Sequence, residues 1–235
     1  MPFTESSPAE NRLLVALPRK DRQRFLSGCA SVELIFAEVL AEPGTRITHV
    51  YFPTDSVISL TTPTDASASL EVGMVGEEGM LGASLMLGVD ISPLYAVVQG
   101  DGAALRMSAA RFRRELAISA TLQREMKRYL YVTMSQIAQT AACTRFHVVE
   151  ERLARWLLMT HDRAHSDEFR VTHEFLAYML GVRRVGVTMA ATSLQKRKLI
   201  RYRRGRITVL NRAGLEAAAC GCYAADIESY TRMMA

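Results

Sequence analysis

The sequence has few cysteines and no long apolar run. Four cysteines among 235 residues are too few and too scattered for the disulfide framework of a small secreted domain. No apolar stretch approaches the ~20 residues that a membrane-spanning helix requires. The first residues include Glu5 and Glu10 and lack an apolar core, which is unlike a secretory signal. These absences predict a soluble, cytoplasmic protein with no membrane partner.

Candidate metal ligands are also sparse. Cys220 and Cys222 are separated by one residue, but no Cys or His pair at zinc-ligand spacing is evident elsewhere. The prediction is therefore reduced thiols and no metal site. A metal-dependent enzyme built on a β-roll needs two histidines and a carboxylate that converge inside the roll. Residues 32–107 contain one histidine, His49, so the sequence disfavours this class and predicts no enzyme.

Basic charge is concentrated in one segment of the chain. The whole chain has a formal net charge of +5. Residues 145–212 hold 15 Lys and Arg against 6 Asp and Glu, a net charge of +9, which leaves −4 on the remainder. A surface that binds nucleic-acid phosphates requires such a concentration. The charge distribution favours two domains with different partners.

The first half of the chain has the texture of an antiparallel β-domain. A helical segment at 13–29, interrupted by Pro18, precedes a series of short apolar or alternating segments. Turn residues such as Pro43-Gly44 and Gly100-Asp101-Gly102 separate them. The expected strands are 32–36, 39–40, 49–52, 57–60, 69–75, 95–98 and 103–107. Many short strands at regular turn spacing favour a sandwich or barrel over a βαβ sheet.

A long helix is expected from about Ser119 to Cys143, after a short helix that Ser108 can cap. Its apolar residues recur near heptad spacing, which fits either a helix packed on its own domain or a dimer seam. We favour the dimer seam, because a long amphipathic helix between two domains needs a partner that buries its apolar face. The predicted dimerisation residues are Leu122, Met126, Leu130, Met134 and Ile137.

Residues 169–200 have the pattern of a helix-turn-helix. Thr172 can cap a first helix, and Gly181 stands where the chain must reverse. In the second helix one apolar face recurs at three and four residues. The residues that fall off that face in its first turns, where a recognition helix enters the DNA major groove, are Arg183, Arg184, Val185, Thr188 and Met189. An ordinary helical domain with a solvated arginine pair would show the same spacing.

The residues that follow favour DNA binding. Residues 199–210 form two alternating segments around Arg204-Gly205, the pattern of a β-hairpin with a basic tip. A hairpin directly after a recognition helix is a wing. The residues expected to contact backbone phosphates are Lys196 with its neighbours Arg197 and Lys198, and Arg203, Arg204 and Arg206 of the wing. Thr172, at the start of the first helix, is a further expected DNA-binding residue.

With these motifs the sequence resembles the Crp–Fnr family of bacterial transcription regulators. The match is most specific over residues 169–210, at 176–184, 187–188, 194–195, 199–200 and the Arg204-Gly205 hairpin. Residues 43–44, 51–53, 71–73 and 76–82 look like the glycine-punctuated β-roll of that family. The resemblance implies an α+β fold: a double-stranded β-helix like the cyclic-nucleotide-binding jelly roll (1–107), a linker and dimerisation helix (108–145) and a winged helix-turn-helix (146–235).

The resemblance also implies roles for single residues. Arg184 stands where the family has an arginine that contacts guanine, a contact that contributes about 1–3 kcal/mol of base discrimination. Family members often have Glu at the position of Val185 and Arg at that of Met189, so the operator should differ from the best-known family sites. Cyclic-nucleotide-binding members place Glu after a glycine and Arg about ten residues later.

This chain departs from the family at the ligand pocket. Ala83 follows Gly82 at the glutamate position, and Ser92 or Pro93 occupies the arginine position. A buried phosphate without a cationic partner is strongly unfavourable, so cAMP is not predicted as a ligand. The family's iron–sulfur version needs a cluster of N-terminal cysteines, and only Cys29 lies there. No cofactor is therefore predicted, His49 stays open as a haem ligand although a lone histidine at a strand start is more often structural, and any other effector is left open. The predicted function is a homodimeric regulator that binds a palindromic double-stranded DNA operator, with RNA polymerase as a further partner if it activates. The alternative is a winged helix that binds a protein.

Overall fold

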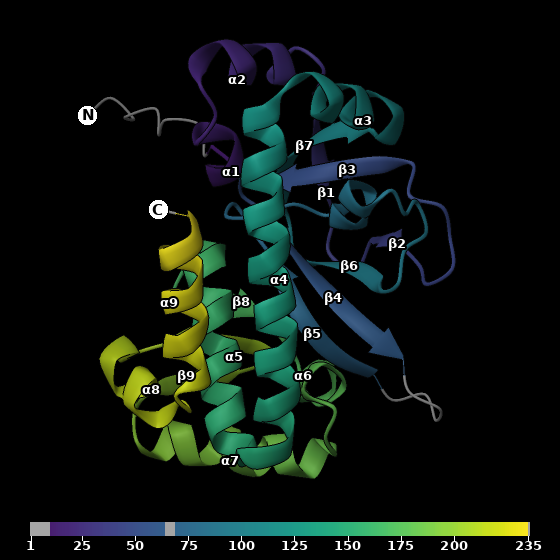
Figure 1. Ribbon diagram of the computed structural model, residues 1–235. Coiled ribbons are helices and arrows are strands. Elements are labelled where there is room, and N and C mark those ends of the chain that lie inside the picture. The colour runs from purple at the N-terminus through teal and green to yellow at the C-terminus, as the bar shows by residue number, and fades with distance from the viewer. Residues whose placement is uncertain (1–9, 64–68, 235) are drawn as a thin grey trace, which may run out of the picture.

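The computed structural model describes residues 10–63 and 69–234 (Figure 1). Within these residues no helix is long and apolar enough to cross a membrane. The chain begins with α1 (Arg12–Val15) and α2 (Arg19–Leu26), and Pro18 separates them as the sequence indicates. Asn11 caps α1, and its side-chain amide donates to the backbone oxygens of Pro53 and Gly79, which attaches this end of the chain to the β-domain.

Two antiparallel sheets form the β-domain. One has the order β1-β7-β3 and the other β2-β6-β4-β5. Apolar residues from both sheets, among them Leu34, Ile58 and Ala104, meet in a shared core. The expected sandwich is therefore confirmed, although a 3-10 helix, η1 (Ala83–Leu87), was not expected. The strands are β1 (Ala30–Leu34), β2 (Val39–Ala41), β3 (His49–Pro53), β4 (Val57–Pro63), β5 (Ser69–Val75), β6 (Tyr95–Gly100) and β7 (Gly102–Ser108).

Helix α3 (Ala109–Ile118) leads into α4 (Ala120–Phe146), which runs the length of the molecule in Figure 1. The hydroxyl of Ser108 caps α3 and that of Ser119 caps α4, so the helix starts are those that the sequence indicates. One face of α4 packs on the β-domain, and α9 lies along another. At about 1.5 Å per residue, α4 is roughly 40 Å long.

The structure corrects part of the predicted dimer seam. Leu122 and Met126 are fully buried in the core of their own domain, together with Phe52 and Phe112. The exposed stripe of α4 is instead formed by Tyr131, Met134, Ile137, Ala138 and Ala141, with Leu130 half-buried at its edge. The apolar residues of α4 therefore belong to two different faces of the helix. One face packs into the core of the β-domain, and the other is exposed.

The C-terminal part folds around its own apolar core, which also includes Met74 of β5. Its three-stranded sheet has the order β8-β10-β9. Strand β8 and the long helix α9 were not predicted. The elements are α5 (Val149–Ala164), β8 (Glu168–Arg170), α6 (His173–Leu180), α7 (Arg184–Lys196), β9 (Ile200–Arg203), β10 (Arg206–Val209), α8 (Arg212–Ala218) and α9 (Cys222–Met234).

Candidate nucleic-acid interface

Helix α6 and the turn after it hold α7 in place. The Thr172 hydroxyl accepts a hydrogen bond from the Phe175 amide at 3.1 Å, which confirms the predicted N-cap. Gly181 ends the helix in the left-handed region, with φ of 62°. A Cβ at Gly181 would lie 3.2 Å from Leu70 of β5, so space as well as backbone conformation favours glycine there. The turn thus fixes the direction in which α7 leaves α6.

Helix α7 has one buried and one exposed face. Val187, Ala190, Ala191 and Leu194 are buried in the C-terminal core. The five residues predicted to face the groove, Arg183, Arg184, Val185, Thr188 and Met189, are all exposed, and the apolar pair stands out because Val185 is 63% and Met189 69% exposed. Two apolar side chains so open to solvent on a helix start are typical of a contact surface.

One contact between α6 and α7 was missed from the sequence. The His173 ring lies 4.2 Å from that of Tyr202 in a stacked arrangement, and its Nδ1 is 3.0 Å from the Thr188 hydroxyl oxygen. Burial lowers the pKa of His173, and the charge of nearby Arg184 lowers it further. Thr188 is therefore held by a neutral imidazole from α6. Because the three residues are far apart in sequence, no local spacing could have indicated this contact.

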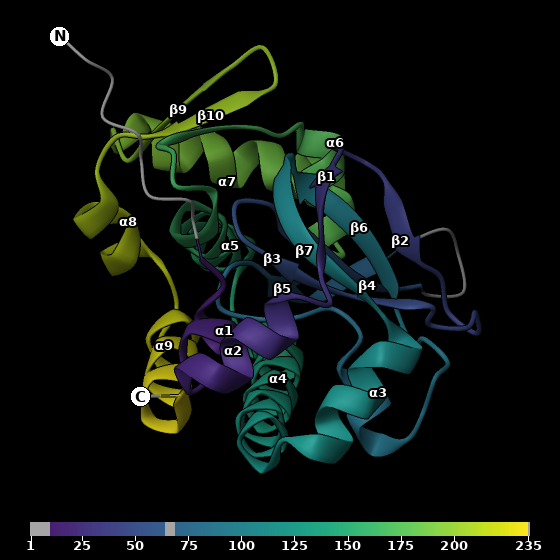
Figure 2. The same ribbon diagram turned by 90° about the horizontal axis from the view of Figure 1, so that it is seen from above.

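The wing forms as predicted, at the Arg204-Gly205 turn. Arg204 has φ of 51° and Gly205 of 74°, so both central residues are left-handed and Arg203 pairs with Arg206 across the turn. Two residues with positive φ are the geometry of a type I′ hairpin. In Figure 2 the hairpin β9–β10 lies alongside α7 at one edge of the molecule.

Some of the cations predicted to contact phosphates are already paired. Arg206 lies 2.9 Å from Glu168 and, by its hydrogen bond, lowers the pKa of that carboxyl group. Arg197 lies 2.9 Å from Glu150. In the described part of the chain no ion pair involves the remaining exposed cations of this surface, Arg183, Arg184, Lys196, Lys198, Arg203 and Arg204. Helix start and wing therefore present unneutralised positive charge on one surface.

A second candidate site is a cavity of about 250 Å³ between the β-domain and α4. Gly82, Ala83, Ser92 and Pro93 line it together, as the resemblance implied for the family's ligand pocket. Its walls are mostly apolar, with Leu60, Met80 and Tyr129 among them. Arg46 also lines it, but Arg46 is 3.0 Å from Asp90 and points largely to solvent.

Comparisons with known proteins place the helix-turn-helix in a family. Residues 151–218 match the family model "Crp-like helix-turn-helix domain". A comparison with curated proteins found no match. Among solved structures, a putative crp/fnr-family transcriptional regulator from Eubacterium rectale is 16% identical, with a TM-score of 0.69 over 89% of this chain and 99% of that one.

Two other solved structures have the same fold. The c-di-GMP-responsive global regulator CLP from Xanthomonas campestris is 17% identical, with a TM-score of 0.67 over 82% of this chain and 99% of that one. FixK2 from Bradyrhizobium japonicum is 13% identical, with a TM-score of 0.69 over 82% and 98%. The fold class and the family resemblance predicted from the sequence are thus confirmed. Residues 151–218 form a Crp-like helix-turn-helix domain, and the chain as a whole has the fold of the Crp/Fnr transcription regulators.

Proposed function

We propose that this chain is a homodimeric transcription regulator that binds a palindromic DNA operator and is not controlled by a cyclic nucleotide. The observation that carries the proposal is the exposed start of α7 beside a basic wing, within a Crp-like helix-turn-helix domain. Bases would be contacted by the first turns of α7, and phosphates by Lys196, Arg203 and Arg204. An activator would in addition contact RNA polymerase.

The base-contacting role rests on Arg184. It lies in the first turn of α7, is exposed and forms no ion pair within residues 10–63 and 69–234. A guanidinium there can make a bidentate contact to O6 and N7 of guanine. Val185 and Met189 offer apolar contact, for which the methyl group of thymine is the base-edge partner. We therefore expect an operator with guanine and thymine in each half-site.

The homodimer is supported by the exposed stripe of α4. Met134 is 63% exposed and Tyr131 54%, on a helix whose other faces are covered by the β-domain and by α9. Two copies joined along this stripe would be related by a two-fold axis. Their recognition helices would then enter successive major grooves ~34 Å apart, which requires a palindromic operator.

The absence of cyclic-nucleotide control is supported by the cavity lining. Ala83 cannot accept a hydrogen bond from a ribose hydroxyl, and neither Ser92 nor Pro93 carries a positive charge. The one arginine of the lining, Arg46, is already paired with Asp90. A phosphate in this mostly apolar cavity would lack the charge-assisted hydrogen bonds that offset its desolvation. An apolar effector suits the cavity better.

Arg184→Ala tests the proposal. The operator is first obtained by selection from random duplexes, and affinity is then measured by fluorescence anisotropy on this operator and on random duplex. Loss of one bidentate contact should weaken operator binding by ~10-fold or more and change binding to random duplex much less. Arg232→Ala, at an exposed arginine near the end of α9, is the matched control.

Two outcomes would contradict the proposal. Unchanged discrimination by Arg184→Ala would mean that α7 does not read bases. Binding of wild-type protein to random duplex that hardly changes from low to moderate salt would mean that the basic surface does not bind phosphates, because counterion release makes such binding strongly salt-dependent. The second outcome would favour a protein partner for the winged helix.

A further inference from the structure

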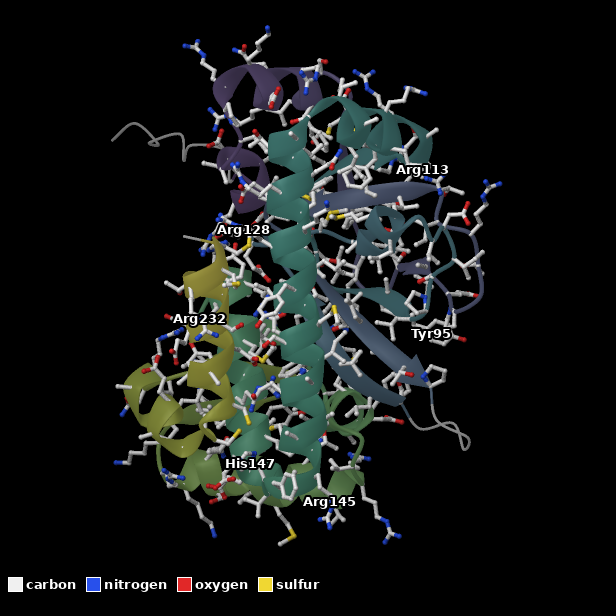
Figure 3. The ribbon with its side chains drawn as sticks, in the orientation of Figure 1. Tyr95, Arg113, Arg128, Arg145, His147 and Arg232 are labelled. Atoms are coloured by element: carbon white, nitrogen blue, oxygen red, sulfur yellow. The ribbon has the colours of Figure 1, made fainter. Side chains whose placement is uncertain are left out.

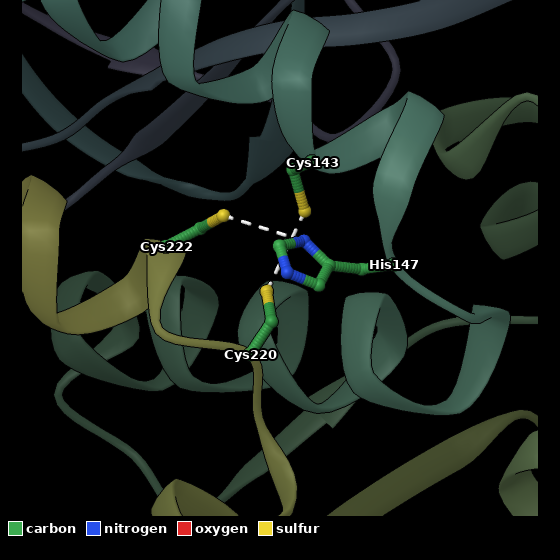
Figure 4. Close-up of side chains that lie close together, drawn as sticks. All are labelled: Cys143, His147, Cys220 and Cys222. Atoms are coloured by element: carbon green, nitrogen blue, oxygen red, sulfur yellow. Dashed lines mark hydrogen bonds between the residues drawn. The ribbon is translucent and has the colours of Figure 1, made fainter.

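Three cysteines and a histidine meet where α4 ends. The Sγ atoms of Cys143, Cys220 and Cys222 and a ring nitrogen of His147 all lie within 4.8 Å of one another (Figure 4). Cys143 and His147 come from the last turn of α4 and its C-cap, whereas Cys220 and Cys222 flank the turn into α9. The fold therefore joins two pairs of thiol and imidazole groups that are more than 70 residues apart.

The separations match a tetrahedral ion. Cys143 Sγ lies 3.5 Å from Cys220 Sγ, and Cys222 Sγ lies 3.5 Å from His147 Nδ1. Zinc bonds of about 2.3 Å to sulfur and about 2.0–2.1 Å to nitrogen place sulfur pairs roughly 3.8 Å apart and sulfur–nitrogen pairs roughly 3.6 Å apart in a tetrahedron. Four donor atoms that all lie within 4.8 Å of one another fit around a single ion, whereas a two-iron cluster needs ligands spread over two metals.

The surroundings suit a buried group of negative charge. The three cysteines are at most 7% exposed. Three thiolates around a divalent ion leave a net charge of −1, and Arg152 and Arg155 line a small pocket together with Cys143. The Gln139 side-chain amide donates to Cys222 Sγ at 2.9 Å, the kind of hydrogen bond that orients a metal ligand.

We propose that Cys143, His147, Cys220 and Cys222 bind one Zn²⁺ ion in a structural site. Four protein ligands complete the tetrahedron and leave no open position for substrate or water. Such an ion ties α9 to the end of α4, next to the junction at Val148 where the chain turns into the helix-turn-helix domain. Figure 3 shows His147 at that end of α4, remote from Arg128.

Only one of the two ligand pairs, Cys220 and Cys222, was recognised in the sequence. The prediction of no metal site rested on the lack of a second pair for Cys220 and Cys222. Cys143 and His147 are four residues apart, which places both on one face of a helix, and this spacing was overlooked. That the two pairs meet follows only from the packing of α9 against α4.

Metal analysis of the full-length protein tests the site without reference to DNA. Wild-type protein purified without added metal should contain one zinc per chain by inductively coupled plasma mass spectrometry. Cys222→Ser and His147→Ala should lose most of it. Cys29→Ser, at a cysteine in the loop before β1, should keep it.

Cobalt provides a second measurement that needs no variant. Chelator-treated, reduced wild-type protein titrated with Co²⁺ should give the intense ligand-field bands of a tetrahedral site and a thiolate-to-cobalt charge-transfer band, saturating at one equivalent. Wild-type protein without zinc that also lacks this spectrum would overturn the proposal. So would a metal-free Cys143–Cys220 disulfide, seen as a loss of two hydrogens in the intact mass of protein isolated without reductant.

Discussion

At the scale of single residues, the buried carboxyl group of Glu71 belongs to a hydrogen-bond network that couples its protonation to the stability of the fold. The Ser59 hydroxyl oxygen lies 2.5 Å from Glu71 Oε2 and 2.6 Å from Gln99 Oε1. One hydroxyl proton cannot serve both acceptors, so a protonated Glu71 that donates to Ser59 satisfies the network. Burial is the largest effect on this group and raises the pKa of Glu71 to about 7. Gln99 then donates to Thr160 of α5 at 3.0 Å, which links the β-domain to the C-terminal part.

Glu71 should make stability depend on pH. The pKa of Glu71 is about 7 in the folded protein and about 4.5 in the unfolded chain, so its contribution to stability is fully retained below about pH 4.5 and lost as pH rises through 7. A shift of this size corresponds to about 3 kcal/mol lost above pH 7. Glu71→Gln mimics the neutral acid and should become more stable than wild type at pH 8 but not at pH 5, as measured by urea denaturation. Glu228→Gln, on an exposed face of α9, is the control; a Glu71→Gln effect that does not vary with pH would contradict the assignment.

At the scale of elements, a glycine before α7 and a glycine inside α7 have opposite roles. Gly181 has φ of 62° and a restricted Cβ position, whereas Gly186 lies inside α7 with its nearest Cβ contacts, to Val149, at 3.9–4.0 Å. Gly181→Ala should lower the free energy of unfolding by about 1–2 kcal/mol, because alanine resists the left-handed region. Gly186→Ala should raise it by up to about 1 kcal/mol through helix propensity. Thermal denaturation of both variants in one buffer makes each the control of the other, and effects of the same sign would contradict this account.

Helix α4 shows how far an element can be predicted alone. Its start is determined locally, because the Ser119 hydroxyl accepts from the Leu122 amide. Its apolar spacing was also evident, but spacing does not say what each face meets. Leu122 and Met126 pack into the core of the β-domain, whereas Tyr131, Met134 and Ile137 in the second half of the helix form an exposed apolar stripe.

At the scale of the whole molecule, the open stripe of α4 predicts the oligomeric state. Met134→Glu combined with Ile137→Glu should convert the proposed dimer to a monomer of 26.1 kDa by sedimentation velocity, because charges that face each other across the proposed seam would be desolvated and would repel. Glutamate at Met126 would not test this, because that side chain is buried in its own domain. Ile227→Glu introduces a charge at an exposed apolar residue of α9 and should leave the dimer intact. A dimer that survives both changes in α4 would place the seam elsewhere.

The sequence by itself determined the features that depend on neighbouring residues. These are the strand series with its glycine turns, the caps at Ser108 and Thr172, the start of the long helix at Ser119, the Gly181 turn and the Arg204-Gly205 wing. Each follows from the backbone preference of neighbouring residues or from the recurrence of apolar residues every two residues in a strand or every 3.6 residues in a helix. Both can be recognised in the sequence alone. The five exposed residues at the start of α7 could be identified for the same reason. The apolar spacing shows which residues are buried, and these five do not belong to that buried face.

Only the tertiary structure decided which distant groups meet. Strand β8 depends on pairing with β10, the His173 contacts on the approach of Tyr202 and Thr188, and the raised pKa of Glu71 on its burial between the sheet and α5. The cluster of Cys143, His147, Cys220 and Cys222 exists because α9 packs against α4. Burial and proximity across the chain are set by packing of whole elements, and no local pattern of residues encodes them.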